Sequence, residues 1–491
     1  MIRRLEWLSG DGRAVRLIGR IALVAVALGL GYALGVLLMS PQCATVVTAV
    51  GVAFCLGAVV VDPKMGMLLW MIVAPYARFI PLDIQLGHGI PDLKLSRLVT
   101  LVLLALWAAQ VAIGRRKLSR VIWSDVFMAL FAVFTLISYS GAPMSTNKAL
   151  QHYWDIWLVP VVAYFLARQL FSTERDVKRI AITIAIVGLY LAVLATHEQM
   201  TGIILFYPED RSVIYSTHVR RVVNLLGNPA FTAVCLAMAA PLAARGMIES
   251  KTRGRRLVWL GVLLALAVGS FMCYNRAGWA AFIASLLVML PFYPRFRKVF
   301  LPVFIAAVVL LVVTWGVVSA TPAIRERLQA EGPIIWRMQV LGTAWKMIKA
   351  HPFTGVGQGN FAALYTLYAR GAAYQYADPN ARVLMSPHNS LVYILVHGGL
   401  MTLVPYLGFM LSAFWVTLRF YLSIADEKAR SLIVATWGAF VAYLLPSMAG
   451  DTVIFAFGAV LFYVLVGGVL GWILGSGQAL IVPKKSAEGA A

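Results

Sequence analysis

A succession of long apolar runs, separated by short basic connections, constrains this chain more than any other feature. Most runs are roughly 17 to 24 residues long, the length that an α-helix needs to cross the hydrocarbon core of a bilayer. Hydrophobic residues make up 61% of the chain and charged residues only 13%. A soluble globular protein carries about twice that charged share. We therefore expect an all-α polytopic membrane protein.

The apolar runs predict about 14 membrane spans. They lie at 17–39, 43–61, 65–80, 95–113, 122–140, 153–171, 177–196, 230–247, 256–273, 277–293, 298–319, 399–419, 431–448 and 452–475. The first run lacks a small-residue cleavage site and is interpreted as a retained span rather than a signal peptide. The predicted parts are membrane helices over 1–320 with an external loop at 197–229, an external helical loop domain at 321–387, C-terminal membrane helices at 388–477 and a tail at 478–491.

The net charge of +22 is explained by its distribution along the chain. Most of the 42 Lys and Arg residues fall in every second short connection, as the positive-inside rule requires of cytoplasmic loops. Both termini and the tail are therefore expected in the cytoplasm, and no nucleic-acid partner is expected. The four cysteines have no metal-type spacing and are expected to be buried in apolar packing.

Several cations on the external side are not required by this topology. Arg276 stands alone between two apolar runs, where an arginine is costly unless it has a partner or an anionic ligand. Arg220 and Arg221, with Arg211 nearby, precede a further span, and guanidinium groups suit the oxygens of a diphosphate. The alternatives are snorkelling to the interface for Arg276 and a solvated face for the other arginines.

The external segment late in the chain holds a predicted helix over 333–350, which His351-Pro352 ends. A glycine-rich turn follows at Gly355–Gly359, but no strand precedes it, so it does not indicate a dinucleotide site. As one helix, the stretch 388–420 would be roughly 50 Å long, more than the bilayer core of about 30 Å. We therefore expect a break at Gly398-Gly399.

His388 is expected in the first turn of the short helix before that break, with Ser386 as N-cap and Pro387 at the first helical position. The positive end of a helix disfavours an imidazolium, so a neutral imidazole that accepts a proton is one interpretation. A structural, hydrogen-bonded histidine is the other.

External carboxylates are scattered without metal-ligand spacing. They include Asp83, Asp92, Glu209, Asp210 and Asp451. Metal-dependent catalysis is therefore disfavoured, and we expect neither a metal nor a cofactor.

These motifs together resemble the O-antigen ligase and O-antigen polymerase superfamily. The resemblance rests on His351-Pro352 followed by Gly355, Gly357, Gly359, Asn360 and Phe361, and on His388-Asn389 separated from Gly399 by the stretch 390–398. Arg221 with Leu225 further matches the Arg-x-x-x-Leu motif that marks the ligases.

The resemblance implies a metal-independent, inverting glycosyltransferase of the GT-C type with about 12 to 14 membrane helices. Such an enzyme transfers a polysaccharide from undecaprenyl diphosphate to the lipid A-core oligosaccharide, at the periplasmic face of the bacterial inner membrane. Membrane lipids are the remaining expected partners.

Residue roles follow from the same resemblance and from the chemistry above. Arg221 and Arg276, with Arg220 and Arg211, would hold the diphosphate. His388 would accept the proton of the acceptor hydroxyl or position that hydroxyl for attack. Four further residues are expected to bind substrate: Arg337, Trp345 and Lys349 of the external helix, and Asn389.

Three other functions remain open from the sequence. O-antigen polymerases and protein O-oligosaccharyltransferases share the lipid-linked donor but use different acceptors. A lipid-linked glycan transporter would also have many spans, but transporters tend to show inverted repeats and polar groups at the membrane midplane, which this sequence does not.

Overall fold

The computed structural model describes residues 57–79, 92–205, 222–321, 325, 332–369 and 386–476. Its elements there are helices, and seven of them are long and apolar enough to cross a membrane. Two shorter apolar helical stretches lie at Trp123–Ile137 and Arg276–Phe292. The predicted all-α, polytopic membrane fold is therefore confirmed. The predicted spans at 17–39 and, for the most part, 43–61 lie outside the described residues.

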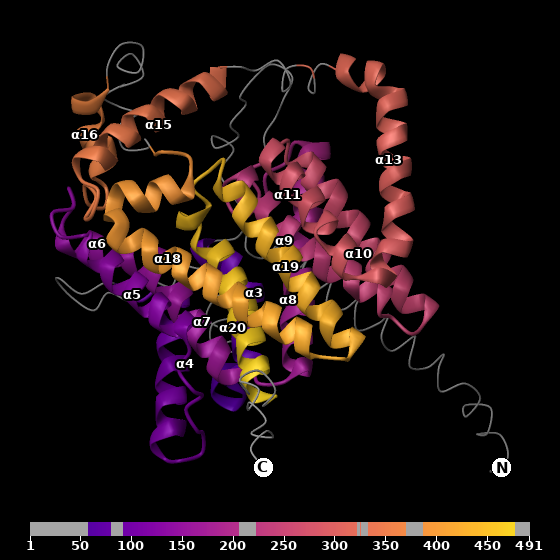
Figure 1. Ribbon diagram of the computed structural model, residues 1–491, viewed down its shortest axis with the longest axis horizontal. Coiled ribbons are helices and arrows are strands. Elements are labelled where there is room, and N and C mark those ends of the chain that lie inside the picture. The colour runs from indigo at the N-terminus through magenta and orange to yellow at the C-terminus, as the bar shows by residue number, and fades with distance from the viewer. Residues whose placement is uncertain are drawn as a thin grey trace, which may run out of the picture.

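The helices follow one another as the apolar runs predicted (Figure 1). The seven candidate spans are α4 (Leu95–Ala112), α8 (Glu174–Thr201), α9 (Pro229–Ile248), α10 (Arg253–Met272), α18 (Ser390–Ser423), α19 (Glu427–Ser447) and α20 (Ala456–Gly475). The others are α3 (Pro63–Val73), η2 (Ala74–Phe79), α5 (Trp123–Ile137), α6 (Thr146–Tyr153), η3 (Trp154–Leu158), α7 (Val159–Leu170), α11 (Arg276–Leu287), α12 (Met289–Phe292), α13 (Pro294–Ala320), α15 (Gly332–Ala350), α16 (Asn360–Tyr368) and η6 (Thr452–Ile454).

Four of the predicted spans are divided between elements. The run at 277–293 is shared by α11 and α12, and the run at 452–475 by η6 and α20. The run at 65–80 is shared by α3 and the 3-10 helix η2, and the run at 153–171 begins as the π-helical η3 before α7. Pro160 explains the division of the run at 153–171, because proline lacks the N–H that an α-helix needs and its ring clashes with the preceding turn. Pro160 is therefore placed in the first turn of α7.

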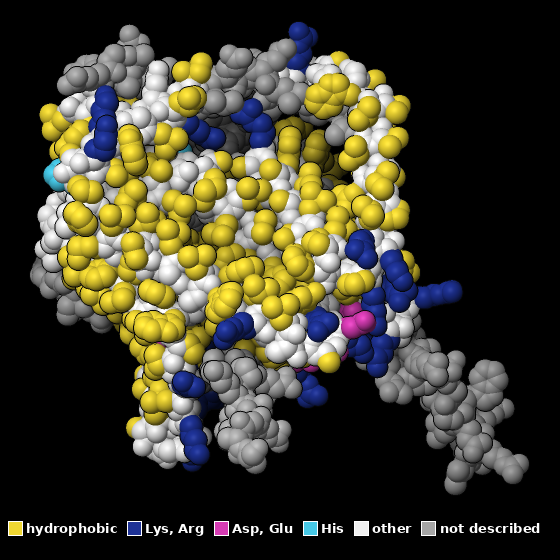
Figure 2. Space-filling model, viewed as in Figure 1, with side chains coloured by type: hydrophobic (Ala, Val, Ile, Leu, Met, Phe, Trp, Pro, Cys, Tyr) yellow, Lys and Arg dark blue, Asp and Glu magenta, His cyan; other side chains and the backbone are white. Residues whose placement is uncertain are grey.

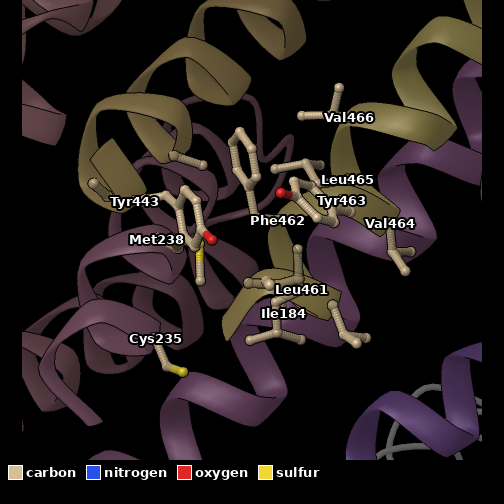
Figure 3. Packing of buried hydrophobic residues seen from close by; sticks show 14 of the residues in the cluster. Ile184, Cys235, Met238, Tyr443, Leu461, Phe462, Tyr463, Val464, Leu465 and Val466 are labelled. Atoms are coloured by element: carbon tan, nitrogen blue, oxygen red, sulfur yellow. The ribbon is translucent and has the colours of Figure 1, made fainter. Parts of the chain in front are cut away.

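The last helix, α20, forms the centre of the bundle and is buried on nearly all sides. Phe462 stacks on Tyr443 of α19 with ring centroids 4.3 Å apart, in a cluster that Figure 3 shows from close by. Gly467, Gly471 and Gly475 follow at intervals of four, and a Cβ on each would lie within 2.6 Å of a backbone oxygen of the segment 164–172. Small residues at this spacing let two membrane helices approach closely.

The surface has the charge distribution of a membrane protein (Figure 2). Hydrophobic side chains cover the middle of this face, whereas Lys and Arg side chains gather above and below them. Figure 1 shows α13 standing apart on the right, and many of its valines are exposed. An apolar helix with little protein around it is suited to contact with lipid.

The predicted break in the long helix α18 lies at Gly399, where φ is 63° and ψ is −165°. Only glycine readily adopts this conformation. Four backbone hydrogen bonds satisfy groups that the break frees: from the N–H groups of Val356 and Gly357 to the carbonyls of Val396 and His397 (2.8 and 3.0 Å), and from those of Leu400 and Met401 to the carbonyls of Pro352 and Phe353 (2.9 and 3.1 Å). The glycine-rich turn after α15 therefore closes the break.

The predicted helix over 333–350 is present as α15, which ends before His351 and lies at the upper left of the molecule in Figure 1. One face of α15 is buried against the rest of the protein. Val340, Ala344 and Met347 are fully buried, whereas Met338 and Trp345 are exposed. Small and flexible side chains fit between α15, α16 and the first segment of α18, where the core also includes Phe361 and Val396.

We predict that Gly399→Ala destabilises the protein by about 1 to 3 kcal/mol from backbone strain alone. The added Cβ would also lie 2.1 Å from the carbonyl oxygen of Phe353. Gly342→Ala is the matched control, because it lies inside α15 with open space around it, and it should be neutral or stabilising by up to about 1 kcal/mol. Thermal unfolding of the purified proteins in detergent measures both, and equal midpoints for the two variants would contradict this account of the break.

Candidate functional site

The site lies where the start of α18 meets the connection between α19 and α20. Asn389 is the N-cap of α18, because its side-chain oxygen accepts hydrogen bonds from the N–H groups of Leu391 and Val392 at 3.0 and 3.1 Å. The expectation that Ser386 caps the helix and that Pro387 begins it was wrong. Asparagine is among the best N-cap residues, and the helix begins after it, at Ser390.

His388 therefore precedes the helix rather than lying in its first turn. Its φ of 51° is in the left-handed region, which few non-glycine residues adopt. Such strain persists only where the surrounding structure holds the residue in place, and it is concentrated at functional sites.

Hydrogen bonds tie the start of α18 to the connection 448–453. The side-chain amide of Asn389 donates to the carbonyl of Met448 at 3.0 Å. The Ser390 hydroxyl donates to the carbonyl of Gly450 at 3.0 Å and accepts from the N–H of Val453 at 3.1 Å. These bonds hold the intervening Asp451 beside His388.

His388 and Asp451 form a pair with a defined orientation. The imidazole Nδ1 lies 3.4 Å from Oδ2 of Asp451, and the Ser386 hydroxyl donates a hydrogen bond to the same oxygen. The Trp336 ring of α15 lies against the imidazole, with centroids 4.8 Å apart. Because Nδ1 faces the carboxyl group, Nε2 is the nitrogen left to accept a proton from a substrate.

Burial sets the protonation of this pair. It lowers the pKa of His388 below its ordinary value, and the neighbouring Arg337 acts in the same direction, whereas Asp451 opposes both. Burial also raises the pKa of Asp451, against the opposing effects of Ser386, His388 and Arg337. His388 is therefore a neutral imidazole at neutral pH, which is the form that can accept a proton.

One guanidinium group, that of Arg337, acts on the pair, and a second, that of Arg276, acts on Arg337. Arg276 is the first residue of α11, whose N-cap Asn275 accepts a hydrogen bond from the N–H of Gly278 at 2.7 Å. Arg337 is half-buried on α15, and its pKa is lowered by burial and by the positive charge of Arg276. Asp451 acts on Arg337 in the opposite direction. A bound anion would relieve the repulsion between two cations held this close.

The remaining predicted site residues do not all lie at the His388–Asp451 pair. Trp345 and Lys349 are exposed on α15, about 12 and 18 Å along the helix axis from Arg337, so the structure does not bring them to the pair. Asn389 lies at the site as a helix cap. Arg211, Arg220 and Arg221 lie outside the described residues.

The segment that follows Arg221 is held by a buried carboxylate. Glu198, at the end of α8, accepts hydrogen bonds from the N–H groups of Val223 and Asn224 at 2.7 and 2.8 Å. Asn224 has a φ of 51°, and Leu225 is fully buried. The leucine of the Arg-x-x-x-Leu motif therefore packs in the core and anchors the chain.

Sequence reasoning did not select Asp451 or Trp336 as site residues. A signal was present for Asp451, because it is a lone carboxylate in a short connection between two apolar runs, where a charged group is costly without a role. No comparable signal marks Trp336, which is one of 14 tryptophans. Among the described residues, no group of three or more His, Cys, Asp and Glu side chains converges as metal ligands do.

Comparison with known families identifies the region that contains most of this site. Residues 260–407 match the model described as O-Antigen ligase. The chain carries a domain of the O-antigen ligase family. This domain includes Arg276, Arg337, His388 and the break at Gly399, whereas Asp451 lies beyond the matched residues. Members of the O-antigen ligase family are membrane enzymes that transfer glycans. This family membership confirms the resemblance that the sequence motifs indicated.

Comparisons with whole proteins give two further findings. No curated protein matches this sequence. A solved structure described as "Structural coordination of polymerization and crosslinking by a peptidoglycan synthase complex" is similar at a TM-score of 0.39 and 14% identity. The likeness covers 71% of this chain and 97% of that chain.

We predict that single substitutions move the pKa of His388 in opposite directions. Asp451→Asn removes the charge that raises this pKa and should lower it, whereas Arg337→Gln removes a charge that lowers it and should raise it. Histidine NMR of selectively labelled protein in detergent measures the pKa of His388 in the parent protein and in both variants. His388→Gln assigns the signal. A shift in the same direction for both variants would contradict the arrangement of the three groups.

Proposed function

We propose that this protein is an O-antigen ligase, a metal-independent and inverting enzyme that transfers a polysaccharide from undecaprenyl diphosphate to the lipid A-core oligosaccharide. The observation that supports it most directly is the juxtaposition of a neutral, oriented imidazole with two guanidinium groups at one end of a membrane bundle. The imidazole can accept the proton of an acceptor hydroxyl, and the two guanidinium groups can bind a diphosphate.

In the proposed reaction, Nε2 of His388 takes the proton of the acceptor hydroxyl as its oxygen attacks the anomeric carbon. The bond from that carbon to the diphosphate oxygen breaks on the opposite face, and the electron pair leaves with the diphosphate. Asp451 holds the imidazole through Nδ1 and stabilises the imidazolium that forms. Attack from the face opposite the leaving group inverts the anomeric centre.

The guanidinium groups are proposed to stabilise the leaving diphosphate. Arg337 carries positive charge beside His388, and Arg276 carries positive charge close enough to act on Arg337. Both charges are available where negative charge develops on the departing diphosphate. We propose the same role for Arg221, with Arg220 and Arg211 assisting, on the basis of the ligase motif. Trp345 and Lys349, exposed on α15, are proposed to contact the bulky acceptor.

The proposed orientation places this site on the periplasmic side of the bacterial inner membrane. The starts of α11 and α18 contribute to the site, whereas the basic connections before α10 and α13 lie at the opposite ends of the bundle. Because cytoplasmic connections are the basic ones, the site faces the periplasm and both termini face the cytoplasm.

Two other acceptors are compatible with the same chemistry. In an O-antigen polymerase the attacking hydroxyl belongs to a second lipid-linked glycan, and in a protein O-oligosaccharyltransferase it belongs to a polypeptide. The match of Arg221 and Leu225 to the ligase motif favours the O-antigen ligase over the polymerase and the protein O-oligosaccharyltransferase.

We predict glycan transfer to lipid A-core when purified protein in detergent is incubated with the lipid-linked donor. A parallel reaction supplies a second lipid-linked glycan as the only acceptor. Product in the second reaction alone would show a polymerase and overturn the ligase assignment. Because detergent leaves no sealed compartment, transfer in either reaction excludes a purely transport role.

We predict that His388→Ala lowers transfer by at least about 10²-fold, which is the usual contribution of a general base. Donor binding should survive in this variant, whereas Arg276→Ala should weaken donor binding or activation, and Arg276→Lys should restore only part of it. His351→Ala is the control, because this histidine is exposed beyond the end of α15. Parental turnover by the His388→Ala protein would remove the proposed base.

A further inference from the structure

A second charged site lies at the opposite end of the bundle. Arg245, in the last turn of α9, is 16 residues after Pro229 at its start, so about 24 Å of helix separates Arg245 from the segment held by Glu198. A cavity of about 320 Å³ opens beside this last turn, between α8, α9, α10 and the start of α19. Its volume is within the range of small-molecule sites.

Most of the charged residues that line the cavity are cations. Five of its lining residues are basic and one is acidic: Lys178, Arg245, Lys251, Arg255 and Lys428 against Glu249. Glu249 is engaged elsewhere, because it accepts a hydrogen bond from the Tyr293 hydroxyl at 2.5 Å and pairs with Arg295 at 3.4 Å. Lys178 pairs with Glu174 at 2.6 Å, whereas the other four cations form no ion pair among the described residues. The cavity therefore keeps a net positive charge.

Arg245 distinguishes this site from a solvated basic face. Its side chain is only 7% exposed, and it donates to the Ser431 hydroxyl at 2.9 Å and to the carbonyl of Lys428 at 3.0 Å. Both acceptors are neutral, and Arg245 forms no ion pair among the described residues. Membrane topology accounts for exposed cations in this connection, but it does not account for a buried one. A buried guanidinium without a carboxylate favours an anionic ligand.

The apolar residues that line the cavity indicate that the anionic ligand is part of a lipid. Ile182 and Trp259 also line the cavity, and the ring of Trp259 packs over Gly246. Along α8, Lys178 is followed at intervals of four by Ile182 and Ile186, both exposed. The basic cavity is therefore continuous with an apolar strip that runs towards the middle of the membrane, as the headgroup and acyl chains of a lipid require.

We propose that this cavity binds the phosphate-bearing headgroup of an anionic phospholipid from the leaflet opposite the candidate active site. The cations hold the phosphate, Trp259 lies at the level of the headgroup, and the acyl chains follow the exposed face of α8. A basic pocket between membrane helices on the cytoplasmic side is suited to this class of lipid. The proposal does not depend on the transferase assignment.

Binding of defined lipids to the purified protein tests whether this cavity holds an anionic headgroup. Protein in a neutral detergent is titrated with phosphatidylglycerol, cardiolipin or phosphatidylcholine, and bound lipid is counted by native mass spectrometry. The double variant Lys251→Gln/Arg255→Gln removes two exposed cations from the cavity, and Arg115→Gln/Lys117→Gln removes two exposed cations from another basic connection on the same predicted side.

The cavity variant should bind the two anionic lipids about tenfold more weakly, while the control variant and phosphatidylcholine binding stay unchanged. No loss in the cavity variant, or an equal loss in the control, would overturn the proposal. Inorganic phosphate at millimolar concentration should not displace the lipid. Displacement by free phosphate would show a site for soluble anions and would overturn the lipid assignment.

Discussion

The backbone hydrogen bonds that close the break in α18 are the constraint on which the site depends. A broken helix inside a membrane protein leaves unpaired N–H and carbonyl groups, which are costly where no water can reach them. The turn after α15 supplies partners for the groups on both sides of Gly399. The first segment of α18 can therefore leave the direction of the second, and it presents His388 beneath α15 instead of continuing as one straight span.

Electrostatics then give this end of the bundle its chemistry. Burial lowers the pKa of His388 and raises that of Asp451, and each group opposes the effect of burial on the other. The imidazole is therefore neutral before the reaction, and the carboxylate beside it stabilises the imidazolium that proton transfer creates. The nearby Arg276 and Arg337 keep the net local charge positive. A site of this kind attracts an anion and still offers a nitrogen that can accept a proton, which are the two requirements of transfer from a lipid diphosphate.

The two ends of the bundle use cations in different ways. At the candidate active site, the arginines lie beside a histidine and a carboxyl group, as a reaction with proton transfer requires. At the other end, Arg245 lies in a cavity whose charged lining consists of lysines, arginines and one glutamate, next to an apolar strip, and no histidine is among the lining residues. This difference in neighbours separates a proposed catalytic role from a proposed lipid-binding role.

Local sequence alone determined the membrane-spanning helical fold, the helix at 332–350 and the break at Gly399. Each follows from interactions within a short stretch: apolar length, a proline after a histidine, and a residue without a side chain where backbone geometry must change. Only the tertiary structure decided that Asp451 would lie beside His388, that Asn389 and not Ser386 would cap α18, and that Arg337 would approach Arg276 while Trp345 would not. These outcomes depend on which distant helix ends pack together, and periodicity along the chain carries no information about contacts across the bundle.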